Sequence, residues 1–121
     1  MSWEIKNNQA IYPQLVEIIK RRIIAGVYPP GERLPSVREL AEDSGVNPNT
    51  MQRALVQLES EGLLNTRRTS GRFVSEDISH LNQMKTSEAQ KLVSAFRLQM
   101  AKLGYDQEAI LELLSAKGEE Q

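Results

Sequence analysis

Two helix-start signals stand close together in the middle of the chain and restrict its fold more than any other feature. Ser36 is followed three residues later by Glu39, the spacing of a capping box in which each side chain satisfies the other's free backbone N–H. Asn47 and Pro48 form the second signal, an N-cap followed by proline at the first helical position. Gly45 lies between them as a helix stop. The spacing predicts two short helices joined by a tight turn.

Helices joined in this way form the helix-turn-helix pattern. Ala41 supplies the small residue needed where the two helices cross closely. In the second helix, predicted over about residues 48–61, the apolar positions follow the i, i+3, i+4, i+7 rule. These positions are Met51, Ala54, Leu55 and Leu58. The pattern predicts that they face the core.

An apolar stripe before this pair predicts another helix. Ile11, Leu15, Ile18, Ile19 and Ile23 recur at helical spacing in "IYPQLVEIIKRRIIAG". Pro13 fits its first turn and Gly26 marks its end. The segment "VYPPGERLP" that follows holds three prolines and a glycine, so we interpret it as a connector.

After the pair, "GLLNTRRTSGRFVSE" predicts a β-hairpin over about residues 64–75, with a turn at Thr69, Ser70 and Gly71. A hairpin in this place is the wing of a winged helix. It carries Arg67, Arg68 and Arg72 and no acid between residues 64 and 74. Such arginines can simply protect a sheet edge, but they also supply phosphate attraction for DNA.

The solvent side of the second predicted helix is unusual because it lacks acids. It carries Asn49, Thr50, Gln52, Arg53 and Gln57, and Arg53 is the only charge between Gly45 and Leu58. Most amphipathic helices merely present such a face to water, usually with Glu and Lys pairs. Facing DNA, a carboxylate would be repelled, whereas Asn and Gln can pair with adenine in the major groove. Asn47 is needed as a cap with or without DNA.

Overall composition excludes several other classes. The 121 residues suffice for one modest core with an appendage, and 15 basic against 16 acidic residues give a net charge of −1. Cysteine is absent, which excludes disulfides and thiolate chemistry. We find no secretion signal or apolar run of membrane-spanning length, so the expected location is the cytoplasm.

The last third predicts helices that need a partner. "EDISHLNQMKTSEAQ" is interpreted as a linker entering a helix capped by Ser87, and Asp106 is expected to cap a final helix that also contains Leu111. Residues 77–121 hold five basic and seven acidic side chains, a net of −2. Two short helices cannot enclose a core, and a second copy is the simplest partner. The dimerisation residues predicted here are Leu92, Val93, Phe96, Met100, Leu103, Ile110, Leu113 and Leu114.

Residues 10–75 resemble the DNA-binding domain of the GntR family of bacterial transcription regulators. The resemblance lies in the proline-glycine connector, "LPSVRELA", "VNPNTMQRALVQLESEG" and "GRFV". "VNPNTMQRAL" and the short chain are most similar to the YtrA branch. The resemblance implies a dimeric winged-helix regulator that binds an inverted-repeat operator, commonly beside genes for an ABC-type transporter.

The resemblance also transfers individual positions. Arg38 matches an arginine that contacts DNA, and Gly71 matches the wing tip. The front of the recognition helix matches at Asn47, Asn49 and Thr50. Pro48 and Gln52 depart from branches that place guanine-reading arginines there, so we expect adenine-rich or mixed contacts. The full predicted DNA-binding set is Arg38, Asn47, Asn49, Thr50, Gln52, Arg53, Arg67, Arg68, Gly71 and Arg72.

The expected fold class is α+β, mainly α, with a winged helix-turn-helix domain over residues 1–76 and a linker with a helical dimerisation region over residues 77–121. No catalytic residues, metal ligands or cofactor are expected, because Ser36 and Ser70 lack a histidine in a motif and His80 is the only histidine. His80 is interpreted as a solvated linker residue, and Met84 and Met100 as packing residues. Double-stranded DNA and a second copy are the expected partners, and any small-molecule effector is unknown. The alternative is a winged helix used for protein contact without DNA readout.

Overall fold

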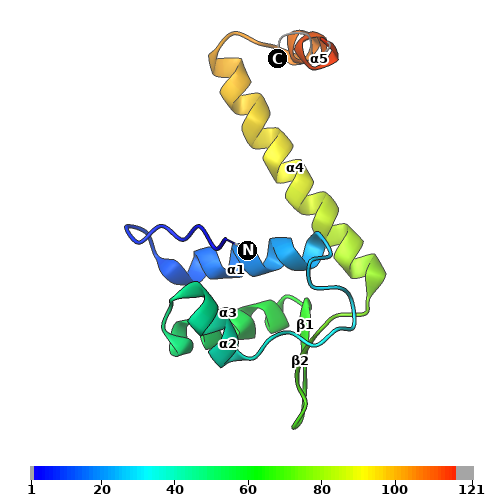
Figure 1. The fold of residues 1–121 in the computed structure, drawn as a ribbon. Coiled ribbons are helices and arrows are strands. Elements are labelled where there is room, and N and C mark those ends of the chain that lie inside the picture. Colours follow the sequence, from blue (N-terminus) through cyan, green and yellow to red (C-terminus); the bar gives the residue numbers. More distant parts are fainter. Residues whose placement is uncertain (1, 117–121) are drawn as a thin grey trace. The chain divides into compact units, whose positions relative to one another are not determined.

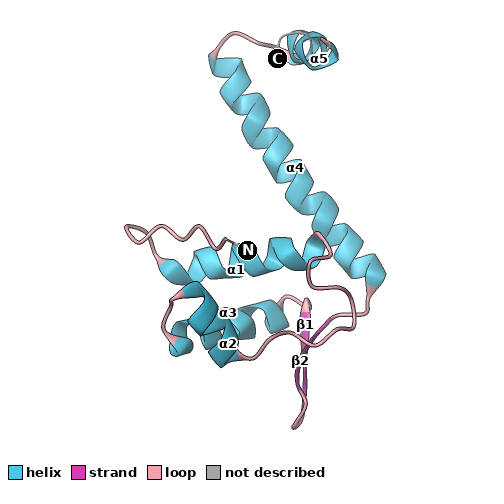
Figure 2. Ribbon diagram, in the orientation of Figure 1, coloured by secondary structure: helices cyan, strands magenta, loops and turns pink. Residues whose placement is uncertain are grey.

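The computed structural model describes residues 2–116, which form five helices and one two-stranded sheet (Figures 1 and 2). The elements in chain order are α1 (Ile11–Ile24), α2 (Val37–Ser44), α3 (Pro48–Ser60), β1 (Leu64–Arg67), β2 (Gly71–Val74), α4 (Ile78–Lys102) and α5 (Gln107–Ser115). The chain divides into two compact units, residues 1–85 and 86–121. Helices dominate, as the predicted mainly-α class requires.

The first unit is built around the helix-turn-helix pair. The Glu39 N–H donates to Ser36 Oγ over 3.1 Å and the Ser36 N–H donates to Glu39 Oε1 over 2.9 Å, which confirms the capping box. Gly45 ends α2 with φ at +74°, a left-handed conformation that favours glycine. Asn47 caps α3 and Pro48 is its first residue. The local signals therefore place both helices as predicted.

The core of this unit lies between α1, α3 and the sheet. Figure 1 shows α1 packed along the helix pair and the hairpin of β1 and β2 projecting away from the helices. The largest fully buried side chains come from all three regions: Leu15, Ile19, Ile23, Met51, Leu55, Leu58, Leu63 and Val74. Burial of such side chains stabilises the fold by about 1.5–3 kcal/mol each.

The hairpin is antiparallel and pairs Leu64 with Val74 and Arg67 with Gly71. The predicted turn is displaced by one residue, because Gly71 pairs in β2 and the turn comprises residues 68–70. Thr69, and not the glycine, lies in the turn with φ at +64°. Its β-branched side chain makes that conformation costly, so the turn is locally strained.

The connector before α2 has more structure than its prolines indicate. Its backbone hydrogen-bonds to β2, with Leu34 N–H donating to the Arg72 carbonyl over 2.8 Å and Gly31 N–H to the Val74 carbonyl over 2.9 Å. Arg33 forms an isolated antiparallel bridge with Phe73. The connector therefore covers the outer edge of β2.

The predicted linker after the hairpin is wrong. Helix α4 begins at Ile78, and Ser87 lies inside it instead of capping it. Asp77 provides the start signal, since its carboxylate accepts the His80 N–H over 3.1 Å. Leu81 is buried in the core of the first unit and Met84 packs against that core. The first unit consequently extends to residue 85, beyond the boundary predicted at residue 76.

The second unit holds the remainder of α4 and α5. Asp106 caps α5 as predicted, because its carboxylate accepts the Ala109 N–H over 2.9 Å. Ile110 is buried, while most other large apolar side chains of this unit are exposed. Over the described part of the chain, no helix combines the length and apolar character needed to span a bilayer.

Candidate nucleic-acid interface

One face of α3 is polar, exposed and free of acids over its first two turns. Met51, Ala54, Leu55 and Leu58 are buried, so the helix turns its opposite side outward. The exposed side carries Asn49, Gln52 and Arg53, together with Val56. Residues 49, 52, 53 and 56 follow helical spacing and share this side. The structure therefore brings together three of the predicted contact residues on one surface.

Asn47 and Thr50 border this surface with different constraints. Asn47 Oδ1 accepts the Asn49 N–H over 2.7 Å, so this oxygen already serves as the helix cap. Its residue is exposed, whereas Thr50 is half-buried. In the first turn of α3, Pro48 has no N–H, and the N–H groups of Asn49 and Met51 both donate to Asn47, so this helix end offers few free N–H groups to a phosphate.

Arg53 is held against α1. Its guanidinium carbon lies 4.1 Å from the centroid of the Tyr12 ring, a cation–π distance. The Tyr12 hydroxyl donates to Gln57 Oε1 over 3.2 Å, and Gln57 Nε2 donates to Glu61 Oε2 over 2.9 Å. Gln57 is therefore engaged within the fold, which separates it from the other amides of α3.

Arg38 is exposed on the first turn of α2, beside the capping box. The pKa of Glu39 is lowered mainly by the backbone N–H of Ser36, with smaller contributions from the Ser36 hydroxyl and the charge of Arg33. Glu39 consequently stays ionised and bonded to its own cap at neutral pH. Arg38 and Glu39 are both exposed in this turn, and Arg38 supplies its positive charge.

The three wing arginines differ in their surroundings. Arg67 lies over the Phe73 ring at 4.1 Å from its centroid, and Arg68 is exposed in the turn. Arg72 Nε lies 3.3 Å from Glu59 Oε1, with its side chain only 16% exposed. Arg72 therefore ties the wing to α3, and Arg67 and Arg68 present the more accessible charges.

Sequence reasoning missed Arg33. It is exposed in the connector, and its side chain runs over Gly71, where an added Cβ would lie 3.0 Å from Arg33 Nε. Gly71 also has φ at +102°, so position 71 favours glycine for two separate reasons. The only sequence signal for it is a basic residue two positions after the connector glycine, in a segment whose prolines indicate a loop.

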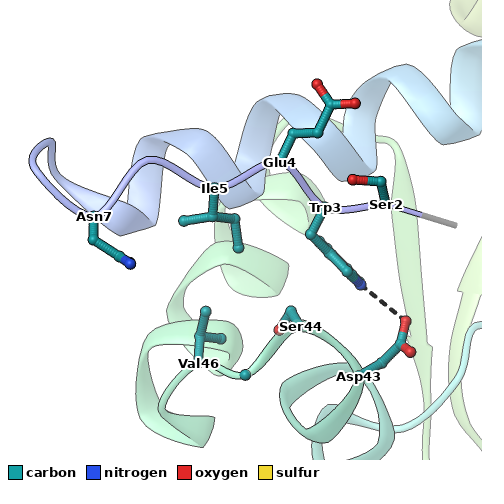
Figure 3. A pocket seen from close by; sticks show the side chains of 9 residues that line it. Ser2, Trp3, Glu4, Ile5, Asn7, Asp43, Ser44 and Val46 are labelled. Atoms are coloured by element: carbon teal, nitrogen blue, oxygen red, sulfur yellow. Dashed lines mark hydrogen bonds between the residues drawn. The ribbon is translucent and has the colours of Figure 1, made fainter.

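A hollow of about 440 Å³ lies behind the helix-turn-helix turn, between Ser2–Asn7 and Asp43–Val46 (Figure 3). Trp3 closes one side, and its indole N–H donates to Asp43 Oδ2 over 2.8 Å. Figure 3 shows Trp3 and Ile5 pointing toward the turn and Glu4 pointing away. Arg22 stacks on Trp3 at 4.0 Å. These contacts attach the N-terminal segment to α2 through Asp43 and to α1 through Arg22.

The predicted dimerisation residues lie in the second unit and are mostly exposed. Phe96 is 43% exposed and Leu103 is 72% exposed, and Leu92, Val93, Leu113 and Leu114 are also exposed. Met100 is half-buried and Ile110 is buried. Several exposed apolar side chains on one helix, as on α4, are typical of an interaction surface.

His80 is not the solvated linker residue that was predicted. Its ring is partly buried and contacts the backbone carbonyl of Glu61. Within residues 2–116, no three His, Asp or Glu side chains gather as a metal site requires.

Comparison with known proteins places this geometry in context. The family model described as "Bacterial regulatory proteins, gntR family" matches residues 11–74. The HTH-type regulator YhcF of Bacillus subtilis is 35% identical over 93% of this chain and 93% of its own length. The HTH-type transcriptional repressor YtrA of the same organism is 40% identical over 60% of this chain and 55% of its own length.

Solved structures give the same result. A GntR family transcriptional regulator from Listeria monocytogenes superposes with a TM-score of 0.85 at 36% identity, covering 91% of this chain and 96% of its own. The DNA-binding domain of AraR in complex with an operator superposes with a TM-score of 0.51 at 34% identity, covering 53% of this chain and 78% of its own. The relatives are named as regulators of transcription, not as enzymes.

Proposed function

This chain belongs to the GntR family of bacterial regulatory proteins, and we propose that it represses transcription as a homodimer bound to an inverted-repeat operator. The family membership makes it a transcription regulator with a DNA-binding domain. The proposal adds the direction of control, the assembly and the form of the site. It also assigns the protein to the cytoplasm, where its DNA target lies.

The acid-free outer face of α3 carries this proposal. Asn49 and Gln52 are exposed there and can each pair with the N6 and N7 of adenine in the major groove. Arg38, Arg67 and Arg68 are exposed around it and can attract phosphates. We propose that Asn47, Thr50, Arg53, Gly71 and Arg72 complete the contact region, with Arg72 acting mainly through Glu59.

The exposed apolar side chains of the second unit support the homodimer. Leu92, Val93 and Phe96 follow helical spacing on α4 and are each more than two-fifths exposed. A second copy would cover them, and two-fold symmetry would present two recognition helices to two half-sites. One short helix per half-site then reaches useful affinity because the two sites are engaged together.

Repression is supported by the similarity to YtrA, which is named a transcriptional repressor. A small dimer on an operator can block polymerase without any further activity. By resemblance to the same branch, we propose that the regulated genes include a neighbouring ABC-type transporter operon. Deleting the gene should raise transcripts of that operon, and unchanged or lower transcripts would contradict repression.

Binding to the DNA upstream of its own gene tests the central claim. We expect the protein to shift this fragment, with log affinity falling linearly as log salt rises. The Arg38→Ala, Arg67→Ala double variant should bind at least about tenfold more weakly, because two phosphate contacts are lost. Footprinting should then reveal two protected half-sites about one helical turn apart.

The same experiment distinguishes DNA binding from the alternative function, a winged helix that docks another protein. A docking surface would expose apolar residues in place of arginines, yet Val56 is the one large apolar side chain exposed on the described residues of α3. Absence of salt-sensitive binding, together with normal folding, would favour protein docking. Unchanged binding by the double variant would remove the wing and α2 from the interface.

A further inference from the structure

Tyr12 lies on α1, outside the recognition helix and the wing, yet it contacts the outer face of α3 directly. The guanidinium carbon of Arg53 lies 4.1 Å from its ring centroid. Its hydroxyl donates to Gln57 Oε1 over 3.2 Å, one turn further along the same helix. Tyr12 thus contacts α3 at both the ring face and the hydroxyl, and its residue is half-buried.

The hydroxyl contact is itself supported. Gln57 Nε2 donates to Glu61 Oε2, and Glu61 Oε1 lies 3.0 Å from Lys20 Nζ on α1. This chain of contacts joins α1 to the end of α3 on the hydroxyl side of the tyrosine, while Arg53 lies over its ring face. The ring is therefore contacted at both its face and its hydroxyl without any ligand.

We propose that Tyr12 is a positioning residue for DNA binding, which holds Arg53 so that its guanidinium edge meets a backbone phosphate of the operator. The inference rests on the proposed function, since it requires DNA on the outer face of α3. It assigns a role to a residue of α1 that no sequence motif indicated.

The geometry suits this role because a stacked guanidinium uses its planar face and leaves its N–H edges available. Those edges match the fork geometry with which arginine binds phosphate oxygens. Among residues 2–116, no carboxylate lies within ion-pair distance of Arg53, unlike Arg72, which pairs with Glu59. Holding the long side chain in advance also lowers the entropy lost on binding.

Arg67 on the wing is arranged in the same way, over the Phe73 ring at 4.1 Å. Glu59, which pairs with Arg72 of the wing, and Arg53 lie on different flanks of the exposed face of α3. Arg67 is thus a second arginine supported by an aromatic ring, on the hairpin that Arg72 ties to α3.

A double-mutant cycle on the full-length protein tests the proposal. Binding of a labelled fragment from the upstream DNA is measured by fluorescence anisotropy over a series of KCl concentrations. The variants are Tyr12→Leu, Arg53→Ala and the two combined, with Tyr12→Phe as the matched control. Tyr12→Phe keeps the ring under Arg53 and removes only the hydroxyl contact.

Arg53→Ala should lower the steepness with which log affinity falls against log salt by about 0.9, because one phosphate contact is lost. Tyr12→Leu should weaken binding by about two- to fivefold in the wild-type background, as expected for an exposed cation–π contact. It should have no further effect when Arg53 is already alanine. Tyr12→Phe should retain the wild-type salt slope.

Equal weakening by Tyr12→Leu in both backgrounds would overturn the proposal, because the tyrosine would then act independently of Arg53. An unchanged affinity and slope for Tyr12→Leu would also overturn it. If Tyr12→Leu fails to fold, pentafluorophenylalanine at position 12 keeps the shape but reverses the charge of the ring face. This variant should bind more weakly than Tyr12→Phe, and equal binding would contradict the role.

Failure of the proposed function gives a different result. In that case the wild-type protein shows no salt-sensitive binding to the fragment at all. Failure of the inference alone leaves wild-type binding intact and changes only the behaviour of the position 12 variants.

Discussion

The ring of His80 is fixed to the end of the recognition helix, with Nε2 lying 2.9 Å from the backbone carbonyl oxygen of Glu61. A carbonyl oxygen can only accept, so Nε2 carries the proton and donates. Gly62 leaves room for the ring, since an added Cβ there would lie 3.1 Å from Nε2. The first turn of α4 is thereby attached to the end of α3.

Removal of this hydrogen bond should destabilise the first unit. His80→Ala leaves the Glu61 carbonyl without its partner, and we expect the free energy of unfolding to fall by about 1 kcal/mol. Urea unfolding followed by circular dichroism measures the change. Asn82→Ala, at an exposed position of the same helix, is the control and should lie within about 0.5 kcal/mol of wild type. Equal stability of the two variants would contradict this role.

Leu81 and Leu92 lie on the same helix, but their substitution should affect different properties: the stability of the fold for Leu81 and the affinity of the homodimer for Leu92. Leu81 is 7% exposed and Leu92 is 57% exposed. Leu81→Ala should lower the free energy of unfolding by about 2–4 kcal/mol, because it opens a cavity in the core. Leu92→Ala should instead raise the dissociation constant of the homodimer. Chemical unfolding and analytical ultracentrifugation separate the two effects, and a reversed outcome would refute the assignment.

The stability that Glu39 gives to α2 should be lost at acid pH. Because the pKa of Glu39 is lowered in the folded chain, its contribution is complete above the ordinary pKa of glutamate, about 4.3, and is lost as the pH falls through the lowered value. Carbon-detected NMR titration of the carboxylate should show this lowered midpoint.

Ser36→Ala removes the hydroxyl part of the same cap, so it should cost about 1 kcal/mol at neutral pH and move the Glu39 midpoint upward. Glu39→Gln should abolish the pH dependence arising from this group. A Glu39 midpoint at the ordinary value in the intact protein would disprove the explanation.

Base contacts and phosphate contacts should respond differently to mutation. Asn49→Ala should weaken binding by about 1–3 kcal/mol on the preferred operator and relax selectivity at one base pair. Arg68→Ala should weaken binding to all sequences and lower the salt slope by about 0.9. Anisotropy titrations against a panel of single-base operator variants measure both. Uniform weakening by Asn49→Ala would exclude it from base readout.

A charge in the apolar surface of the second unit should disrupt the dimer. Phe96→Asp places a carboxylate where we propose contact with a second copy, so the dissociation constant should rise at least about thirtyfold. Ser94→Asp, at an exposed position of the same helix, is the matched control because it adds the same single negative charge. Sedimentation should show a monomer for Phe96→Asp. An unchanged dimer would show that the dimer interface does not include Phe96.

Local signals made much of this fold predictable. The capping box at Ser36, the cap at Asn47 and the apolar spacing of α3 each act within a few residues, so their effect can be inferred from sequence. The start of α4 is hard to predict because Asp77 follows β2 after only two residues and the next residues include several polar side chains. Only the tertiary contacts of Leu81 and His80 distinguish this segment from a linker.

The candidate interface was predictable as a set of positions but not as a set of contacts. The acid-free run around α3 identified Asn49, Gln52 and Arg53. Nothing in the spacing indicated that Arg53 lies over Tyr12 or that Arg72 pairs with Glu59, because these partners are distant in sequence or on another element. Arg33 was missed for the same reason, since its importance depends on its passage over Gly71.

The connector's attachment to β2 divides the wing into two parts that should differ in amide hydrogen exchange. At the base, the N–H groups of Leu34 and Val74 are bonded across the sheet, so their deuterium uptake should be slow. In the turn, Arg68 and Thr69 are exposed and should exchange rapidly, whereas the Ser70 N–H donates to the Arg67 carbonyl over 3.1 Å. Any slowing in the turn on adding DNA can then be assigned to contact with the ligand, since the base supplies an internal reference in the same hairpin.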